Sequence, residues 1–337
     1  MEKDDIIIRN AIMHILDSTV GMPVLSDTLL TLNPELNDFL RNHIYKVMSG
    51  DDLKTCVFDE ETSMVYHFIQ EFSEDMMIDV TKKLAELLYT IMNSNTDIPA
   101  ADVFFVTYQM QSQQHLAILK MNYKEVYMHY TSMNEMEGNI NDIMKQSCAL
   151  PRTGGKLTEA VVISLEENTV QLIEKRFEVN GTKTNYLSEL YLKCHAKMSQ
   201  KTKLDIVTKA VDQIHKKYFE GDFKKKMEAK SVIHNSYAEQ GALKVEEIGE
   251  ELFGEIPEIR EEFVEKLEKY KLLKEEIKVN NEKTTKKFEK QYLMTDSGIE
   301  INIPMEEYNN KRHVEFITNK DGTISVLIKN VNRITTK

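Results

Sequence analysis

The sequence has few cysteines and no long apolar run, and both shortages limit what the protein can be. Its three cysteines, Cys56, Cys148 and Cys194, lie far apart, and no C-x-x-C pair occurs. The odd number argues against a disulfide framework and the spacing argues against a structural zinc site, so we expect reduced thiols. No uncharged run of membrane-spanning length occurs, and the acidic N-terminus, MEKDDIIIRN, does not read as a signal peptide. We therefore expect a cytoplasmic protein without a membrane partner.

Motifs for catalysis and for nucleotide binding are also missing. Gly154-Gly155-Lys156 lacks the preceding glycine and the following Ser or Thr of a phosphate-binding loop, so we interpret it as a turn. The nine histidines include no H-E-x-x-H pattern. The acidic run Asp59-Glu60-Glu61 could help hold Mg²⁺, but its neighbours favour a solvated loop. We expect no cofactor, no metal site and no catalytic residue.

Charge is distributed very unevenly along the 337 residues. Residues 1–150 carry 10 Lys and Arg against 23 Asp and Glu, a net charge of −13, whereas residues 151–337 carry 33 against 32. At physiological salt, electrostatic fields decay within about 8 Å, so an acidic chain can still attract a polyanion to one basic region.

The first half alternates strand and helix patterns. Two strands, Asp5–Leu16 and Val24–Leu32, are expected around Gly21-Met22-Pro23, and two amphipathic helices follow. Asn33 and Pro34 begin the first helix, and Ser73 can cap the second, over about 75–92. The later strands have short connections, which only antiparallel pairing allows. These expected strands are Val103–Met110, His115–Asn122, Lys124–Tyr130, Ala160–Leu165 and Val170–Phe177.

The second half is helical and then returns to strands. Asn180-Gly181 ends the sheet, and Asp321-Gly322 between alternating runs predicts a hairpin. We expect an α+β protein: residues 1–180 form an antiparallel sheet domain with helices on one face, 181–280 a mainly helical, lysine-rich segment, and 281–337 a small β-rich module. The expected helices are 187–198, 200–219, 223–240, 244–253 and 258–273.

Lysines are concentrated in the middle of the chain. Eleven lie between residues 193 and 230, with only five acids among them. In the helix over 200–219 they fall largely off the apolar stripe, a pattern that is also typical of a solvated helical face. If these lysines bind DNA, they contact backbone phosphates with little base discrimination, because lysine lacks the bidentate fork of arginine. The candidate residues are Lys201, Lys203, Lys209, Lys216, Lys217, Lys224, Lys225, Lys226 and Lys230.

The order of several segments resembles that of a known family. The paired runs Phe104–Tyr108 and Leu116–Met121 come first, Tyr186-Leu187-Ser188-Glu189-Leu190 precedes the helical region, and Gly298-Ile299-Glu300-Ile301 precedes the last hairpin. Over nearly its whole length the chain thus resembles the bacterial nucleoid-associated protein family (NdpA-like). The family commonly has a glycine–arginine–lysine run after the Tyr-Leu step, and this chain has Tyr191–Lys197 there without the glycine and the arginine.

The resemblance implies a non-enzymatic protein of the nucleoid. Its partners would be DNA or DNA-bound proteins such as a type II topoisomerase, and related domains occur as non-enzymatic subunits of antiviral defence systems. One alternative is a protein-binding adaptor that acts through the acidic N-terminal domain. Another is a metal-dependent nuclease, for which Glu159, Glu174 and Arg176 on paired strands give a weak pattern. A homodimer stays open.

Overall fold

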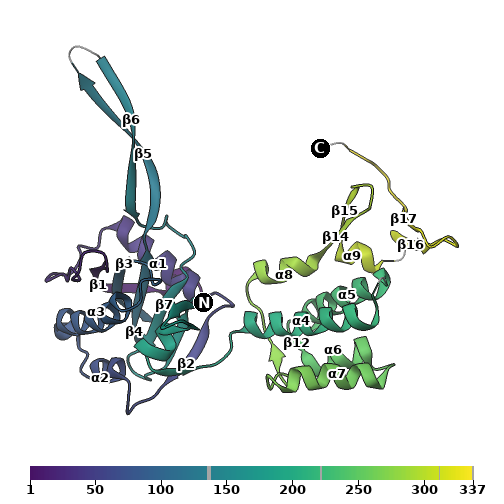
Figure 1. Ribbon diagram of the computed structural model, residues 1–337, viewed down its shortest axis with the longest axis horizontal. Helices are drawn as coiled ribbons and strands as arrows, with labels where there is room; N and C mark the ends of the chain where they lie inside the picture. The colour runs from purple at the N-terminus through teal and green to yellow at the C-terminus, as the bar shows by residue number, and fades with distance from the viewer. Residues whose placement is uncertain (135–137, 221, 311, 336–337) are drawn as a thin grey trace. The chain divides into compact units, whose positions relative to one another are not determined.

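The computed structural model describes residues 1–134, 138–220, 222–310 and 312–335. Contacts divide the chain into two compact units, Met1–Ser199 and Gln200–Lys337, which we call the sheet unit and the helical unit (Figure 1). None of the described helices has the length and apolar character that crossing a membrane requires. The three-module division at residues 180 and 280 stays a prediction.

A seven-stranded sheet forms the centre of the sheet unit, in the order β1-β3-β4-β7-β8-β2-β11. All neighbouring strands are antiparallel, and the expected hairpins β3–β4 and β7–β8 are confirmed. The strands are β1 (Ile7–Leu16), β2 (Lys54–Phe58), β3 (Ala101–Met110), β4 (Gln113–Asn122), β7 (Glu159–Ser164), β8 (Val170–Ile173) and β11 (Cys194–Ala196).

Helices cover both faces of this sheet, so the expectation of helices on one face was wrong. On β3, Phe104 shares a core with Leu40 of α1, and Phe105 shares the opposite core with Leu84 of α3. The physical reason is that β3, β4 and β7 are apolar on both faces, and each face must be covered. The helical elements are η1 (Lys3–Asp5), α1 (Pro34–Met48), α2 (Met64–Gln70), η2 (Glu74–Met76) and α3 (Met77–Asn93).

The predicted start of the first helix is confirmed, whereas two neighbouring predictions are not. Asn33 accepts a hydrogen bond from the backbone N–H of Leu36 at 2.8 Å, and Pro34 is the first residue of α1. Residues 24–32 form only one isolated bridge, between Val24 and Ile15, and no strand. Ser73 makes no side-chain cap, because the short turn η2 intervenes before α3.

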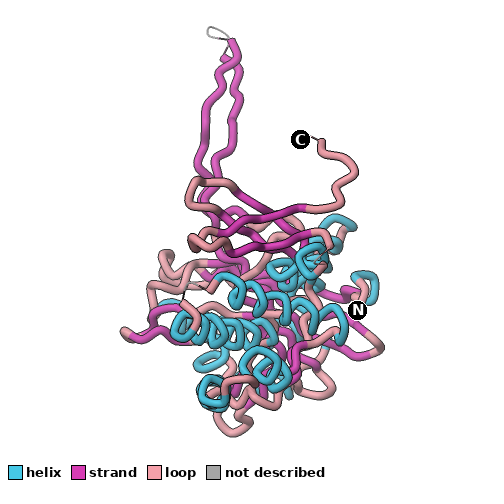
Figure 2. The backbone as a smooth tube through the Cα atoms, turned by 90° about the vertical axis from the view of Figure 1, so that its right-hand side faces the viewer, coloured by secondary structure: helices cyan, strands magenta, loops and turns pink. Residues whose placement is uncertain are grey.

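Among the residues that the structure describes, strands β5 (Lys124–Asn134) and β6 (Gly138–Ala149) pair only with each other. They form a two-stranded hairpin, here called the arm (124–149), which stands away from the seven-stranded sheet (Figures 1 and 2). The sequence pattern predicted the beginning of β5 as part of the meander and missed β6.

The helix expected over 187–198 is absent. The chain instead makes a single π turn, η3 (Leu187–Tyr191), and then β11 pairs with β2. Three short strands complete this region: β9 (Phe177–Val179), β10 (Thr182–Thr184) and β11 itself. The buried side chains of Tyr186, Leu187 and Tyr191 belong to the core under the sheet, and this packing overrides the helical periodicity.

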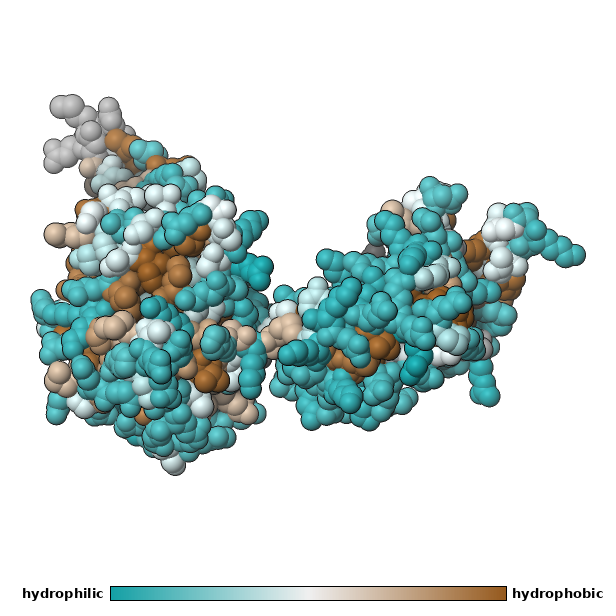
Figure 3. Space-filling model, turned by 60° about the horizontal axis from the view of Figure 1, so that its bottom comes forward, coloured by the Kyte–Doolittle hydropathy of each residue, from teal (hydrophilic) through white to brown (hydrophobic). Residues whose placement is uncertain are grey.

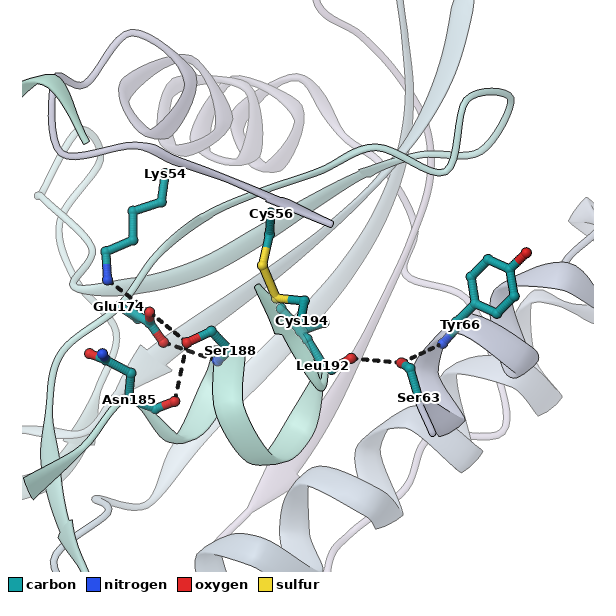
Figure 4. The surroundings of a disulfide bond; sticks show 9 residues. All are labelled: Lys54, Cys56, Ser63, Tyr66, Glu174, Asn185, Ser188, Leu192 and Cys194. Carbon is teal, nitrogen blue, oxygen red and sulfur yellow. Dashed lines mark hydrogen bonds and ion pairs between the residues drawn. A yellow bond between two sulfur atoms is a disulfide. The ribbon is translucent and has the colours of Figure 1, made fainter. Parts of the chain in front are cut away.

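The expectation of reduced thiols was also wrong for two cysteines. Cys56 on β2 and Cys194 on β11 form a disulfide across 138 residues of sequence, and Cys148 is free (Figure 4). Sequence spacing could not reveal this pair, because only the fold brings β2 and β11 together. Glu174 lies beside this bond and accepts hydrogen bonds from the backbone N–H and the hydroxyl of Ser188, at 3.0 and 2.8 Å.

Most of the helices expected between residues 200 and 273 are present in the helical unit. Gly241 ends α5 in a left-handed conformation, φ 68°, which glycine adopts without strain. The predicted hairpin around Asp321-Gly322 is confirmed by the pairing of β16 with β17. The helices are α4 (Gln200–Tyr218), α5 (Phe223–Gln240), α6 (Val245–Phe253), α7 (Pro257–Glu268), α8 (Glu282–Glu289) and α9 (Met305–Asn309). The strands are β12 (Leu243–Lys244), β13 (Glu276–Ile277), β14 (Lys290–Met294), β15 (Glu300–Pro304), β16 (Val314–Thr318) and β17 (Ile324–Ile328).

Candidate nucleic-acid interface

The nine candidate lysines all lie on α4 and α5. The buried residues of α4 recur at helical spacing, at Leu204, Val207, Val211 and Ile214, so this face is fixed against the rest of the unit. The lysines between them are directed toward the surface. Helix α5 begins where Asp222 accepts a hydrogen bond from the backbone N–H of Lys225 at 3.1 Å.

Four of the nine lysines are engaged by groups of the protein itself. Lys203 pairs with Glu275 at 2.8 Å, and Lys225 pairs with Glu228 at 3.2 Å. Lys230 donates to the backbone carbonyl of Lys290 at 2.6 Å, and burial lowers its pKa. These contacts make the three lysines poor candidates for a partner's phosphates.

Lys217 is the fourth, and it is held by a carboxylate on α7. Its ammonium lies 2.7 Å from Glu262, which also accepts a hydrogen bond from the Tyr218 hydroxyl at 2.7 Å. Hydrogen bonds from Lys217 and Tyr218 lower the pKa of Glu262 to about 2. The hydrogen bond to Glu262 correspondingly raises the pKa of Lys217. This charge is therefore already matched.

The other five lysines are exposed and have no acidic partner within the described residues. Their charges are therefore available to an anionic partner. They are Lys201, Lys209, Lys216, Lys224 and Lys226.

Two of the grooves beside these lysines differ in charge. The first has a volume of about 590 Å³ and contains Lys216 and Lys226. Three carboxylates, those of Asp212, Glu220 and Asp222, line it as well, so it is not a basic surface.

The second groove, of about 450 Å³, is formed by α4, α5, α8 and β14. Lys226, Lys230 and Lys287 line it, and Asp212 is the one acid among the described residues that do so. Lys287 pairs with Asp205 of α4 at 3.2 Å. Tyr292 also lines it and is 66% exposed, with the Lys230 ammonium 5.7 Å from its ring centre. This groove therefore has more lysines than acids on its lining and an accessible aromatic ring, and Lys226 is the lining lysine without a partner among the described residues.

Sequence reasoning missed the contribution of α8 to this groove. Its three lysines follow the spacing i, i+3, i+4, which places them on one face of a helix. Phe288 is buried, and α8 packs beside α5. The lysine spacing was visible in the sequence, but only the fold places it next to the 224–230 lysines. The residues are Lys283, Lys286 and Lys287, and Lys290 follows as the first residue of β14.

The carboxylates considered for a nuclease are occupied by other groups of the protein. Glu159 is fully buried and lies 3.3 Å from the Lys120 ammonium, and it accepts a hydrogen bond from the Tyr186 hydroxyl. Glu174 pairs with Lys54 at 2.9 Å (Figure 4). No group of three metal-binding side chains occurs among the residues that the structure describes. These contacts hold the two carboxylates in place within the sheet unit.

The glycine turn and the acidic loop have local structural roles. Lys156, which follows Gly154 and Gly155, pairs with Asp52 at 2.6 Å, so its charge is matched within the sheet unit. Asp59 accepts a hydrogen bond from the backbone N–H of Thr62 at 3.3 Å, in the turn before α2.

Comparison with known proteins adds one finding. Residues 12–335 match the model of the family described as nucleoid-associated protein YejK. The match spans both units, in agreement with the extent of the resemblance seen in the sequence. No curated protein matches the chain.

Proposed function

The chain belongs to the family of the nucleoid-associated protein YejK, and from this premise we propose that it binds DNA through backbone phosphates. The contacts are made by lysines of α4, α5 and α8, and no reaction is catalysed. The observation that supports this most strongly is the groove between α5 and α8, where lysines from two separate stretches of sequence adjoin.

Charge separation within the helical unit supports the same interface. Residues 200–337 carry 26 Lys and Arg against 26 Asp and Glu, so the unit as a whole is neutral. Residues 200–240 nevertheless carry a net charge of +3 and residues 282–294 one of +2, whereas residues 241–281, with α6 and α7, carry −5. Since the Debye length is about 8 Å, DNA near α4, α5 and α8 is attracted mainly by the local positive charge.

The visible surface of the helical unit is largely hydrophilic, with apolar side chains gathered in small patches (Figure 3). A polar surface with lysines and few aromatic rings fits phosphate contacts on a duplex better than the stacking of single-stranded bases. Lysine-based contacts carry little sequence information, so we expect similar affinity for unrelated duplexes.

A DNA titration at several salt concentrations tests this proposal. Each neutralised phosphate contributes about 0.9 to the slope of log K against log salt. Replacing Lys216, Lys224 and Lys226 by Gln should weaken binding equally for unrelated sequences and flatten this slope by up to about 2.7 units. These lysines are exposed, so the fold should lose no more than about 0.5 kcal/mol for each change.

The matched control removes three exposed lysines from the acidic segment of the same unit. Lys269, Lys271 and Lys274 replaced by Gln should leave both the affinity and the slope nearly unchanged. Equal losses in the two triple variants would show that only net charge matters, and the proposed interface would be wrong. An unchanged slope in the first variant would contradict the proposal directly.

A second candidate is the protein-binding adaptor, and the charge of the sheet unit favours it. Residues 1–199 carry 17 Lys and Arg against 29 Asp and Glu, a net charge of −12, which suits a basic partner protein. A type II topoisomerase or a defence-system protein is the partner implied by the resemblance. Absence of DNA binding together with co-purification of such a partner would favour the adaptor over the DNA-binding proposal.

A further inference from the structure

The arm exposes large apolar side chains along most of its length. Met128 is 54% exposed, Tyr130 is 52% exposed and Met144 is 50% exposed, and apolar surface is visible on the arm next to its tip (Figure 3). A two-stranded hairpin without further partners is marginally stable in water, and large exposed apolar patches mark interaction sites. We therefore expect the apolar surface of the arm to be buried by a binding partner.

One face of the arm is the more continuous. Directly opposite residues of an antiparallel pair lie on the same face, and the register pairs Met128 with Met144. By strand alternation, Val126 and Tyr130 lie on this same face, on either side of Met128. We call this the methionine face.

The methionine face carries a positive charge near its base and a negative charge toward its tip. Lys124 has the same strand parity as Val126 and Met128, and Asp142 lies directly opposite Tyr130. Both are exposed, and neither has an ion pair within the described part of the chain. Asp142 accepts a hydrogen bond through Oδ1 from the Ile143 backbone, which leaves Oδ2 for a partner. The one ion pair described on the arm, between Lys145 and Glu125 at 2.6 Å, joins residues of the other face.

The charge of the arm argues against DNA as the covering partner. Residues 124–149 contain two lysines and four acids, a net charge of −2. A nucleic-acid backbone would be repelled by such a ribbon. A second arm that runs in the opposite direction would instead place its negative Asp142 near Lys124 of the first arm. Its positive Lys124 would at the same time lie near Asp142 of the first arm.

We propose that the methionine face binds the same face of a second copy of this chain, arm against arm and antiparallel. A two-fold axis between the Val126 and Met128 positions brings Lys124 of each copy over Tyr130 of the other, with Asp142 on the neighbouring strand about 4.8 Å to the side and within reach of the long lysine side chain. The apolar side chains of the face then pack together between two symmetric ion pairs. This inference does not depend on the DNA-binding proposal.

The size of the face predicts a weak and reversible association. With the two-fold axis between positions 126 and 128, residues 124–130 of the two arms overlap; these seven residues are about 23 Å long, and two strands about 4.8 Å apart make a ribbon about 10 Å wide. Each copy would bury about 230 Å², and the sum of about 460 Å² lies well below the roughly 1,200 Å² of a stable interface. We therefore expect a dimer that dissociates on dilution.

Sedimentation equilibrium of the full chain over a wide concentration range tests this. Wild type should shift from monomer to dimer as the concentration rises. Met128→Lys should weaken dimerisation at least tenfold, whereas Ile143→Lys, an equal change on the opposite face, should leave it unchanged. Wild type that stays monomeric throughout would overturn the proposal, and so would equal effects of the two substitutions.

Charge reversal gives a second and independent test. Lys124→Asp and Asp142→Lys should each weaken the dimer, and the double variant should restore it, because the intermolecular pairs re-form with reversed sign. Circular dichroism establishes that each variant is folded. A double variant weaker than both single variants would overturn the antiparallel arrangement. A monomeric wild type whose Met128→Lys variant loses DNA affinity would assign the arm to nucleic acid instead.

Discussion

The side chain of His14 is buried in the sheet unit, and its hydrogen bonds fix its protonation state. Its Nδ1 accepts a hydrogen bond from the backbone N–H of Ser26 at 3.1 Å, so the ring proton is on Nε2, which lies 3.1 Å from the Thr81 hydroxyl. Protonation of Nδ1 would break the first of these bonds. Burial, with a smaller contribution from Lys82, lowers the pKa of His14 to about 4.

This shift predicts a pH dependence of stability. The folded-state pKa of about 4 lies below the ordinary value of 6.5, so the neutral ring stabilises the fold above pH 6.5, and this is lost as the pH falls toward 4. Between pH 7 and pH 5 the contribution of His14 should fall by about 2 kcal/mol. Urea unfolding should show His14→Gln less stable than wild type at pH 7, with a gap that narrows at pH 5. His129→Gln, at an exposed position of the arm, should keep the wild-type pH profile, and a constant gap for His14→Gln would contradict the assignment.

The disulfide between Cys56 and Cys194 is a second feature of residue scale with a measurable consequence. It closes a loop of 138 residues, and closing so long a loop restricts the unfolded chain, which typically stabilises a fold by about 2–4 kcal/mol. Reduction should therefore lower the melting temperature of wild type to that of the Cys56→Ser, Cys194→Ser double variant. That variant should not respond to reductant.

Counting reactive thiols shows whether the change in melting temperature on reduction comes from the Cys56–Cys194 disulfide. Denatured wild type should react at one thiol, that of Cys148, before reduction and at three afterward. Cys148→Ser should keep the full response to reductant. Three reactive thiols in denatured, unreduced protein would show that the bridge does not form.

At the scale of elements, prediction succeeded where local signals and tertiary packing agree. Helix α1 begins at Asn33 and Pro34 as its capping residues require, and the hairpin β3–β4 follows from two apolar runs around a short polar break. The helix predicted over residues 187–198 does not form. Its helical spacing competes with the burial of Tyr186 and Tyr191 under the sheet and with the pairing of β11 with β2.

The arm and the candidate interface show the limit of sequence reasoning at this scale. Strand β6 has exposed side chains on both faces, so it lacks the alternation by which a half-buried strand is recognised. The lysines of α5 were found because they are consecutive. Those of α8 were overlooked because they lie about 60 residues further on, and only the packing of α8 beside α5 unites the two sets.

At the scale of the whole molecule, the net charge of the chain changes at the boundary between its two compact units. The contact-based boundary at Ser199 separates a unit of net charge −12 from a neutral unit whose charges are segregated. Residues 181–199 lie on the sheet side of this boundary, since Tyr186, Leu187 and Leu192 are in its core and Cys194 is bonded to β2. Repulsion of DNA by the sheet unit and attraction by one surface of the helical unit together would favour a single mode of binding.

This division predicts where a protease cuts first. Lys197 and Lys201 are exposed and flank the boundary, and the disulfide at Cys194 anchors the chain just before it. Brief trypsin treatment of the native chain should therefore cleave after Lys197 or Lys201 and leave two fragments that resist further digestion, because each retains its own core. Lys120, which is exposed to solvent by only 2% and pairs with Glu159, should resist over the same period.

Mass spectrometry of the fragments distinguishes this boundary from the sequence-based ones. The boundaries expected from the sequence lie at residues 180 and 280, and Lys183, in the β9–β10 hairpin, is exposed as well. A cut after Lys183 would leave its two products joined by the disulfide until reductant is added, because Cys56 and Cys194 lie on opposite sides of it. A cut after Lys197 releases its fragments without reductant. First products that separate only after reduction would therefore place the boundary near residue 180, and release without reductant would place it at Ser199.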